Sequence, residues 1–244
     1  MSDTENLTLN LEAAVSTEIE TVLDALENKA PVEANEEPAQ PEFTEVLAEI
    51  TEDVRDQMMT ALTAGFDTRA EYEKVKNGFN ENIQDTIKKE RAKMVRPGLA
   101  AILAAANVDP KFINREEHTG KRFNVYAFGK INDVIYGLST GHFKNAINLA
   151  IMRSMFKFRA SGLPFTGLMA EAAASDKVKV DKAMASVLVR HTVAAGTAST
   201  QKSSTMNALE VLGIVQNKGS DKFPIYELTD APITKRVEAL LAAA

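Results

Sequence analysis

Apolar residues recur at helical spacing along most of the chain from Phe43 onward. The clearest early stripe runs from Phe43 to Leu62, and Gly65 is expected to end that helix. Asp67 or Thr68 is then expected to cap a second helix, with Glu71 completing a capping box, and this helix is expected to run to about Val95. Similar patterns predict further helices over about 97–107, 131–138, 141–160, 165–174, 178–195, 200–213 and 233–243. The pattern therefore predicts a mostly α fold.

Two segments depart from the helical pattern. Residues 123–128 alternate between two sets of side chains and are expected to form a short strand with aromatic rings on one face. A second strand-like stretch, which ends at Leu228, is expected to form a hairpin. We therefore expect very little β structure, limited to one short hairpin and this isolated segment.

Residues 1–42 have the composition of a disordered acidic tail. They end in a Pro/Glu/Ala-rich stretch over 30–41 that is too polar to bury a face. Apolar residues at helical spacing between Leu11 and Leu26 leave open a partner-induced helix over 11–28. We predict three parts: a disordered acidic tail (1–42), a helical domain with a basic-aromatic region (43–162) and a C-terminal module (163–244).

Charge is divided unevenly between the start of the chain and the rest. Residues 1–56 hold 16 acids and two bases, a net charge of −14. Because the whole chain carries −6, residues 57–244 carry +8. A basic body suits a polyanionic partner, and an acidic arm can either compete for the same surface or recruit another protein.

Several classes of function are disfavoured by what the sequence lacks. The chain has no cysteine, which removes disulfides, thiolate catalysis and cysteine-ligated metals. It has no phosphate-binding glycine motif, and His118, His142 and His191 are isolated from other metal ligands. We therefore expect no enzyme activity and no cofactor or metal. No apolar run approaches the roughly 20 residues of a bilayer span, and no secretory leader is visible. A cytoplasmic location without a membrane partner is expected.

The first positive signal is a basic-aromatic region over 111–161. It contains nine bases, three acids and eight of the chain's 15 aromatic residues. Proteins that bind single strands combine cations for the phosphates with rings for the bases. The alternative interpretation is that the rings form the core and the cations only solvate the surface. We predict phosphate contacts from Lys121, Arg122, Lys130, Arg153, Lys157 and Arg159, and base stacking on Tyr126, Phe128 and Phe156.

The second signal lies within 199–229, which resembles the recognition helix and wing of winged-helix DNA-binding domains. A polar helix start leads into Ala-Leu-x-x-Leu-Gly-Ile-Val, then a glycine-centred turn at Gly219 and a Tyr-x-Leu-Thr strand. The recognition segment has one base and no Arg, which weakens the case for sequence-specific reading of guanine. Winged helices also serve as protein–protein modules. The resemblance implies a winged-helix-like C-terminal part with backbone contacts from Arg190, Lys202, Ser203, Lys218 and Lys222.

Together, the acidic leader (residues 1–56), the basic-aromatic region and the wing-like segment resemble the single-stranded-DNA-binding proteins of certain lytic podophages. The resemblance implies binding to single-stranded DNA in support of phage replication or transcription, with a phage RNA polymerase or replication protein as a partner. We predict single-stranded DNA binding with little sequence specificity. The alternatives are a winged-helix transcription regulator that binds double-stranded DNA, and a structural or scaffold protein. The alanine-rich helices near 97–107 and 233–243 suggest a homo-oligomer.

Overall fold

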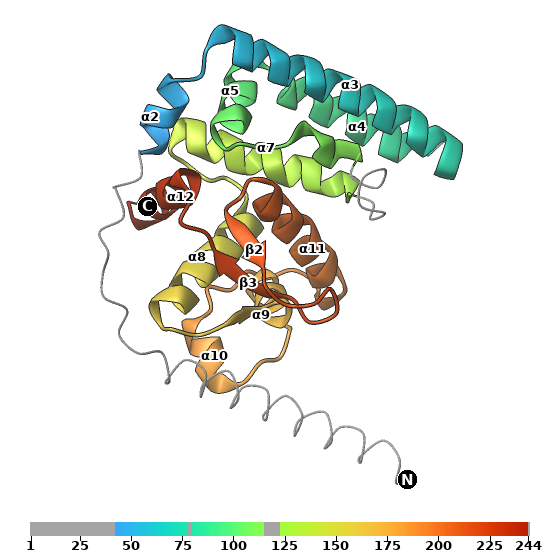
Figure 1. Cartoon of the computed structure of the whole chain (residues 1–244). Coiled ribbons are helices and arrows are strands. Elements are labelled where there is room, and N and C mark those ends of the chain that lie inside the picture. The colour runs from blue at the N-terminus through green and yellow to red at the C-terminus, as the bar shows by residue number, and fades with distance from the viewer. Residues whose placement is uncertain (1–41, 78–79, 115–122, 244) are drawn as a thin grey trace. The chain divides into compact units, whose positions relative to one another are not determined.

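The computed structural model describes residues 42–77, 80–114 and 123–243, which belong to one compact unit (Figure 1). The tail expected over 1–42, apart from Glu42, lies outside the described residues, and so does the partner-induced helix considered over 11–28. The α-helices are α2 (Phe43–Ala48), α3 (Glu52–Asn77), α4 (Glu81–Met94), α5 (Pro97–Ala105), α7 (Val125–Thr140), α8 (Ala146–Ala160), α9 (Gly167–Ala174), α10 (Lys182–Val187), α11 (Ala195–Val211) and α12 (Pro232–Ala242). A short 3₁₀ helix, η1, covers Pro110–Asn114. The mostly α prediction is confirmed.

The long helix α3 lies at the top of Figure 1, where it packs on α4, α5 and η1, with α7 below them. Helix α3 continues through Gly65 and Thr68, so the expected helix end at Gly65 and the expected helix start near Thr68 are both wrong. The expected second helix is instead divided between α3 and α4, which begins at Glu81. A Cβ at Gly65 would lie 3.1 Å from Cδ1 of Ile113, so glycine is used here for the close approach of η1. The helix is interrupted earlier, between α2 and α3. There the Thr51 hydroxyl accepts a hydrogen bond from the Val54 amide at 3.3 Å and caps α3.

The strand expected over 123–128 is wrong, because α7 begins at Val125. The Asn124 side chain caps this helix by accepting a hydrogen bond from the Tyr126 amide at 3.0 Å. Ten of the sixteen residues of α7 are buried, among them Phe128. Since α4, α5, α11 and α12 all pack against α7, its apolar residues cover most of its circumference. A six-residue window of such a helix looks like an alternating strand.

The C-terminal part contains a small antiparallel sheet with strand order β1-β3-β2. Its strands are β1 (Phe165–Thr166), β2 (Val215–Asn217) and β3 (Ile225–Leu228). The expected hairpin is confirmed as β2–β3, and the two-residue strand β1 was not predicted. It pairs Phe165 with Tyr226 and Thr166 with Ile225. The sheet therefore fastens the segment that precedes α9 to the hairpin.

The helix expected over 178–195 is shorter than predicted. Only Lys182–Val187 is helical there, and α11 begins at Ala195 rather than near residue 200. Backbone hydrogen bonds explain the difference, because the His191 amide donates to the Ala173 carbonyl and the Asp176 amide donates to the His191 carbonyl. These tertiary bonds replace the bonds that a continuous helix would make.

Helices on the two sides of residue 162 pack against one another. The long helix α11 contacts α7 and α8, and α8 lies along α9. Polar bonds reinforce this packing: Asn124 donates to Ser204 Oγ at 3.1 Å, and Thr205 donates to Asn148 Oδ1 at 2.9 Å. The division into 43–162 and 163–244 stays a prediction, and α8 is in direct contact with the second part.

Candidate nucleic-acid interface

Helix α8 brings four of the predicted site residues onto neighbouring positions. Asn145 caps this helix, because its Oδ1 accepts a hydrogen bond from the Asn148 amide at 3.1 Å. Phe156 and Lys157 lie three and four residues after Arg153, so each neighbours Arg153 on the surface of the helix. Lys157 is exposed, and Arg153 is partly exposed. This part of the surface of α8 combines two cations with an aromatic ring.

The guanidinium of Arg159 already interacts with a carboxylate and with an aromatic ring of the same protein. Its Nη2 lies 2.6 Å from Oε2 of Glu238 on α12, and its guanidinium carbon lies 5.1 Å from the centre of the Phe156 ring. The Phe156 ring is itself partly buried against the core. Phe156 and Arg159 are thus a ring–cation pair at the edge of α8, with one face of the ring occupied.

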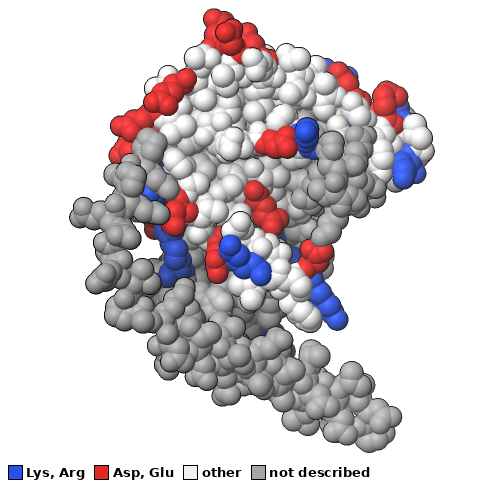
Figure 2. Space-filling view, viewed as in Figure 1, with Lys and Arg blue, Asp and Glu red and all other residues white. Residues whose placement is uncertain are grey.

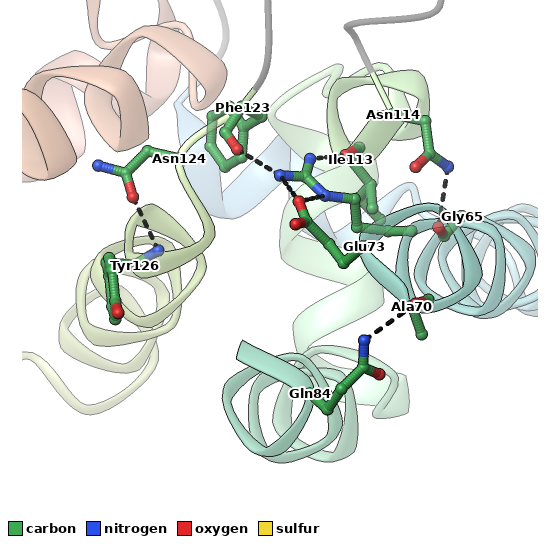
Figure 3. Close-up of polar contacts among 10 residues, drawn as sticks. Gly65, Ala70, Glu73, Gln84, Ile113, Asn114, Phe123, Asn124 and Tyr126 are labelled. Atoms are coloured by element: carbon green, nitrogen blue, oxygen red, sulfur yellow. Dashed lines mark hydrogen bonds and ion pairs between the residues drawn. The ribbon is translucent and has the colours of Figure 1, made fainter. Parts of the chain in front are cut away.

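Tyr126 lies at the start of α7 and is 57% exposed. Its position is set by Asn124, which caps α7 (Figure 3). Asn124 also donates to Ser204 on α11. The first turn of α7 therefore lies against α11. Of the rings predicted to stack on bases, Tyr126 is the most exposed.

The predicted residues of α11 and the wing remain at the surface. Ser203 is exposed on α11, and the neighbouring Lys202 lies 3.5 Å from Oε2 of Glu171 on α9. Lys218 and Lys222 are exposed in and beside the turn that joins β2 to β3. The turn carries two lysines whose ammonium groups are accessible to a phosphate.

Three predicted contacts are contradicted by burial or by internal hydrogen bonds. Phe128 is completely buried against Phe66, Phe112 and Phe123, so its ring cannot stack on a base. Lys130 is only 8% exposed, because α7 is a helix that turns this side chain inward. Its Nζ lies 3.4 Å from Asn145 Oδ1, and burial lowers the pKa of Lys130 despite the attraction of the Asp133 carboxylate.

Arg190 is the third correction. Its guanidinium donates to the backbone carbonyls of Ala172, Ser175 and Val178. These bonds hold the extended segment before α11 against the end of α9. The side chain thus stabilises the fold, and the predicted contact with the DNA backbone is wrong.

Lys121 and Arg122 lie outside the described residues, but the residues on either side of them are firmly attached to α3. Arg69 donates to the Ile113 carbonyl at 2.8 Å and to the Phe123 carbonyl at 2.7 Å, and it forms an ion pair with Glu73 at 2.8 Å (Figure 3). Asn114 donates to the Gly65 carbonyl at 2.8 Å. The two flanks of residues 115–122 are therefore fixed to one helix.

Two exposed rings were missed by the sequence analysis. Tyr136 on α7 is 42% exposed, and Nζ of Lys144 lies 3.0 Å from its hydroxyl and 4.6 Å from the ring centre. Phe223 in the β2–β3 turn is 66% exposed, and Nζ of Lys222 lies 5.3 Å from its ring centre. The sequence did contain a signal for Phe223, because it is a phenylalanine inside an otherwise polar, glycine-containing turn.

Acidic side chains gather over α2 and the start of α3, at the upper left and top of Figure 2. The exposed acids in that stretch are Glu42, Glu45, Glu49, Glu52, Asp53 and Asp56. Hydrogen bonds to Asp56 and Glu52 raise the pKa of Arg55, the one base among them. Lysine and arginine are scattered in small groups on this face of the molecule. The negative charge of the leader thus continues onto the folded body.

Among the described residues, no group of His, Asp and Glu side chains has the arrangement of a metal site. Within the same part of the chain, no helix is long and apolar enough to cross a membrane. Comparison with known proteins found no matching family model, curated protein or solved structure.

Proposed function

We propose that this protein binds single-stranded DNA with little sequence specificity. One observation supports the proposal above the others: four rings at or near the surface each have a cation close to the ring centre. These pairs are Tyr136–Lys144 at 4.6 Å, Phe156–Arg159 at 5.1 Å, Phe223–Lys222 at 5.3 Å and Tyr72–Lys76 at 5.7 Å. A single strand presents base faces and phosphates together, so it rewards rings and cations placed side by side.

The remaining contacts come from α7, α8 and the wing. Tyr126 offers a further exposed ring. Arg153 and Lys157 share one side of α8, and Lys218 adds a cation at the wing. These cations contact phosphates, which are the same for every sequence, and stacking tolerates every base. Both kinds of contact therefore give affinity with little discrimination between sequences.

The wider role belongs to the same proposal. The protein supports phage replication or transcription in the host cytoplasm, beside a phage RNA polymerase or replication protein. It acts without a cofactor and without enzyme activity of its own. It assembles as a homo-oligomer through its alanine-rich helices, of which α5 and α12 are the described counterparts.

A salt titration of binding tests the proposal. We expect a fluorescein-labelled oligothymidylate to bind more tightly than a hairpin duplex of the same length, as measured by fluorescence anisotropy. Affinity should fall steeply between about 50 mM and about 200 mM salt, because cations condensed on the strand are released when the protein binds. Equal or weaker binding to the single strand would contradict the proposal.

A matched pair of variants locates the interface. Replacing Arg153 and Lys157 by glutamine should lower the slope of log affinity against log salt by about 0.7 for each lost phosphate contact. The control replaces Lys88 and Lys89 by glutamine, because both are exposed on α4 and their loss removes the same charge. If both double variants lower the slope equally, affinity depends on net charge alone and α8 is not the interface.

A second candidate function is supported by the C-terminal part. Helix α11 is followed directly by the β2–β3 hairpin, as the winged-helix resemblance implies. The exposed side of α11 carries small polar groups that can meet a duplex backbone, among them Ser199, Thr200 and Ser203. Preference for one duplex sequence in the same assay would favour a transcription regulator. Absence of binding to either form, with large assemblies in light scattering, would favour a scaffold protein.

A further inference from the structure

Phe223 is the most exposed aromatic residue in the part of the chain that the structure describes, with 66% of its surface accessible. It lies in the turn between β2 and β3, where most neighbouring side chains are polar. A large apolar ring in this position gains nothing from burial in the protein core. An explanation for it therefore has to come from what the turn contacts.

The turn that carries Phe223 is held by its own hydrogen bonds. The side-chain oxygen of Asn217 accepts from the Gly219 amide at 3.0 Å and from the Ile225 amide at 3.2 Å. The Phe223 amide donates to Ser220 Oγ at 3.1 Å. The backbone on both sides of the ring is thus fixed before any ligand binds, which reduces the entropy lost on binding.

Gly219 allows this turn to close tightly. A Cβ at this position would collide with the Phe223 carbonyl oxygen and would lie 2.7 Å from the Ile225 nitrogen. The backbone of residue 219 therefore packs directly beneath the residues that carry the ring. Only glycine fits there without moving Phe223.

The far side of the turn is attached to α9. The Gly167 amide donates to the Pro224 carbonyl at 3.0 Å, and a Cβ at Gly167 would lie 2.8 Å from Pro224 Cγ. The residue after Phe223 is therefore fixed against the first turn of α9. The ring is presented at the end of a hairpin that is anchored at both sides.

We propose that Phe223 is a stacking platform for an unpaired base, and that Lys222 and Lys218 contact the phosphates next to that base. The inference rests on the proposed function and assigns separate roles to the ring and to the two lysines of this turn. The turn holds two lysines and one acid, Asp221, and its net positive charge favours a nucleic acid over an apolar protein surface. Both lysines are exposed, and the Lys222 ammonium lies 5.3 Å from the ring centre. A nucleotide likewise carries an aromatic base close to a negatively charged phosphate, so it can contact the ring and the ammonium group together.

Replacing Phe223 by tryptophan gives a direct readout, because the natural chain contains no tryptophan. Stacking of a base on the indole should quench the emission of the F223W variant when oligothymidylate is added. An abasic oligomer of the same length, which offers phosphates without bases, should leave the emission unchanged. Phe223→Ala should weaken binding to oligothymidylate by about fivefold to a hundredfold, the range of one base–aromatic stack. Phe223→Tyr should restore most of that loss.

Controls separate failure of this inference from failure of the proposed function. Val75→Ala, which shortens another highly exposed apolar side chain on α3, should leave affinity unchanged. If wild-type protein binds oligothymidylate but the F223W emission does not respond, Phe223 is not a stacking residue, and contact with another protein becomes the better explanation of its exposure. An equal loss for Phe223→Ala on the abasic oligomer would also overturn the inference. If wild-type protein binds no single strand even at low salt, the proposed function itself is wrong.

Discussion

The buried ion pair between Arg69 and Glu73 should make α3 sensitive to a single substitution. Each side chain is 2% exposed, and Nη2 of Arg69 lies 2.8 Å from Oε1 of Glu73. Glu73→Ala would leave a guanidinium buried beside an empty position. Breaking a buried pair in this way typically costs about 3–5 kcal/mol, a large part of an ordinary stability of about 5–15 kcal/mol. For a body of this size the melting temperature should fall by about 6–20 °C.

Removal of both charges should be tolerated better than removal of one. In a double variant with Arg69→Met and Glu73→Leu, no unpaired charge stays buried. The carbonyls of Ile113 and Phe123 still lose their donor, at about 1 kcal/mol each. The double variant should therefore be more stable than Glu73→Ala by about 1–3 kcal/mol.

Urea denaturation followed by far-UV circular dichroism measures the changes in free energy of unfolding, and a thermal melt followed by the same signal measures the melting temperature. Glu71→Ala is the control, because Glu71 pairs with Lys74 in water-accessible surroundings with a side chain that is 69% exposed. The control should cost no more than about 1 kcal/mol. A loss for Glu73→Ala as small as that of the control would refute the reasoning, since it would mean that water compensates the buried guanidinium.

Two further expectations concern Tyr226 and Gly137. Burial, reinforced by the Glu210 carboxylate, raises the pKa of Tyr226 to about 12, whereas the unfolded phenol ionises near about 10. The stability that this contributes is present below about pH 10 and is lost as the pH rises towards 12. Phenolate absorbance should show a tyrosine that is still neutral above about pH 11. The Tyr226→Phe variant should lack this late change in absorbance. Gly137→Ala places a Cβ 2.5 Å from Cε1 of Phe143 and should cost about 1–3 kcal/mol by urea denaturation, whereas Gly98→Ala, with open space around it, should not.

The helices with a clean apolar stripe could be predicted from the sequence. The predicted helices that approximate α8 and α12 each have polar residues on one side and a capping residue or proline near the start. The division between α3 and α4 was missed, because apolar residues at helical spacing continue across it. The error at 123–128 arose because α7 is buried on most of its sides, so a short window showed no polar face. The apolar positions that continue to Leu138 have helical spacing, and a longer window would have favoured a helix.

Partners that are distant in sequence explain the other errors. The segment before α11 has helical composition, but it bonds to Ala173 and Asp176 instead. The role of Arg190 follows from three carbonyls at the end of α9 and beyond it, none of them next to it in sequence. The position of Lys130 likewise depends on the burial of α7. Neither side chain could be recognised as internal from its own neighbours.

Within the candidate site, local spacing predicted what lies on one helix, and tertiary structure decided the rest. Arg153, Phe156 and Lys157 were identified together because they lie in one basic-aromatic stretch of sequence, in which Arg153 and Lys157 are one helical turn apart. Phe223 was missed because exposure of a ring in a turn depends on how that turn is held. Asn217 and Gly219 close the turn, and their contacts with Ile225 depend on the pairing of β2 with β3.

Only part of the acidic leader (residues 1–56) lies within the described residues. Of its net charge of −14, residues 1–41 carry −9 and residues 42–56 carry −5. The second share lies on α2 and the first turns of α3, where the acids are exposed and fixed to the body. A folded acidic surface repels a polyanion from one side of the molecule, because the charges cannot move to cover a cation elsewhere. Under the proposed function, the fixed acids over 42–56 should therefore orient a bound strand away from α2.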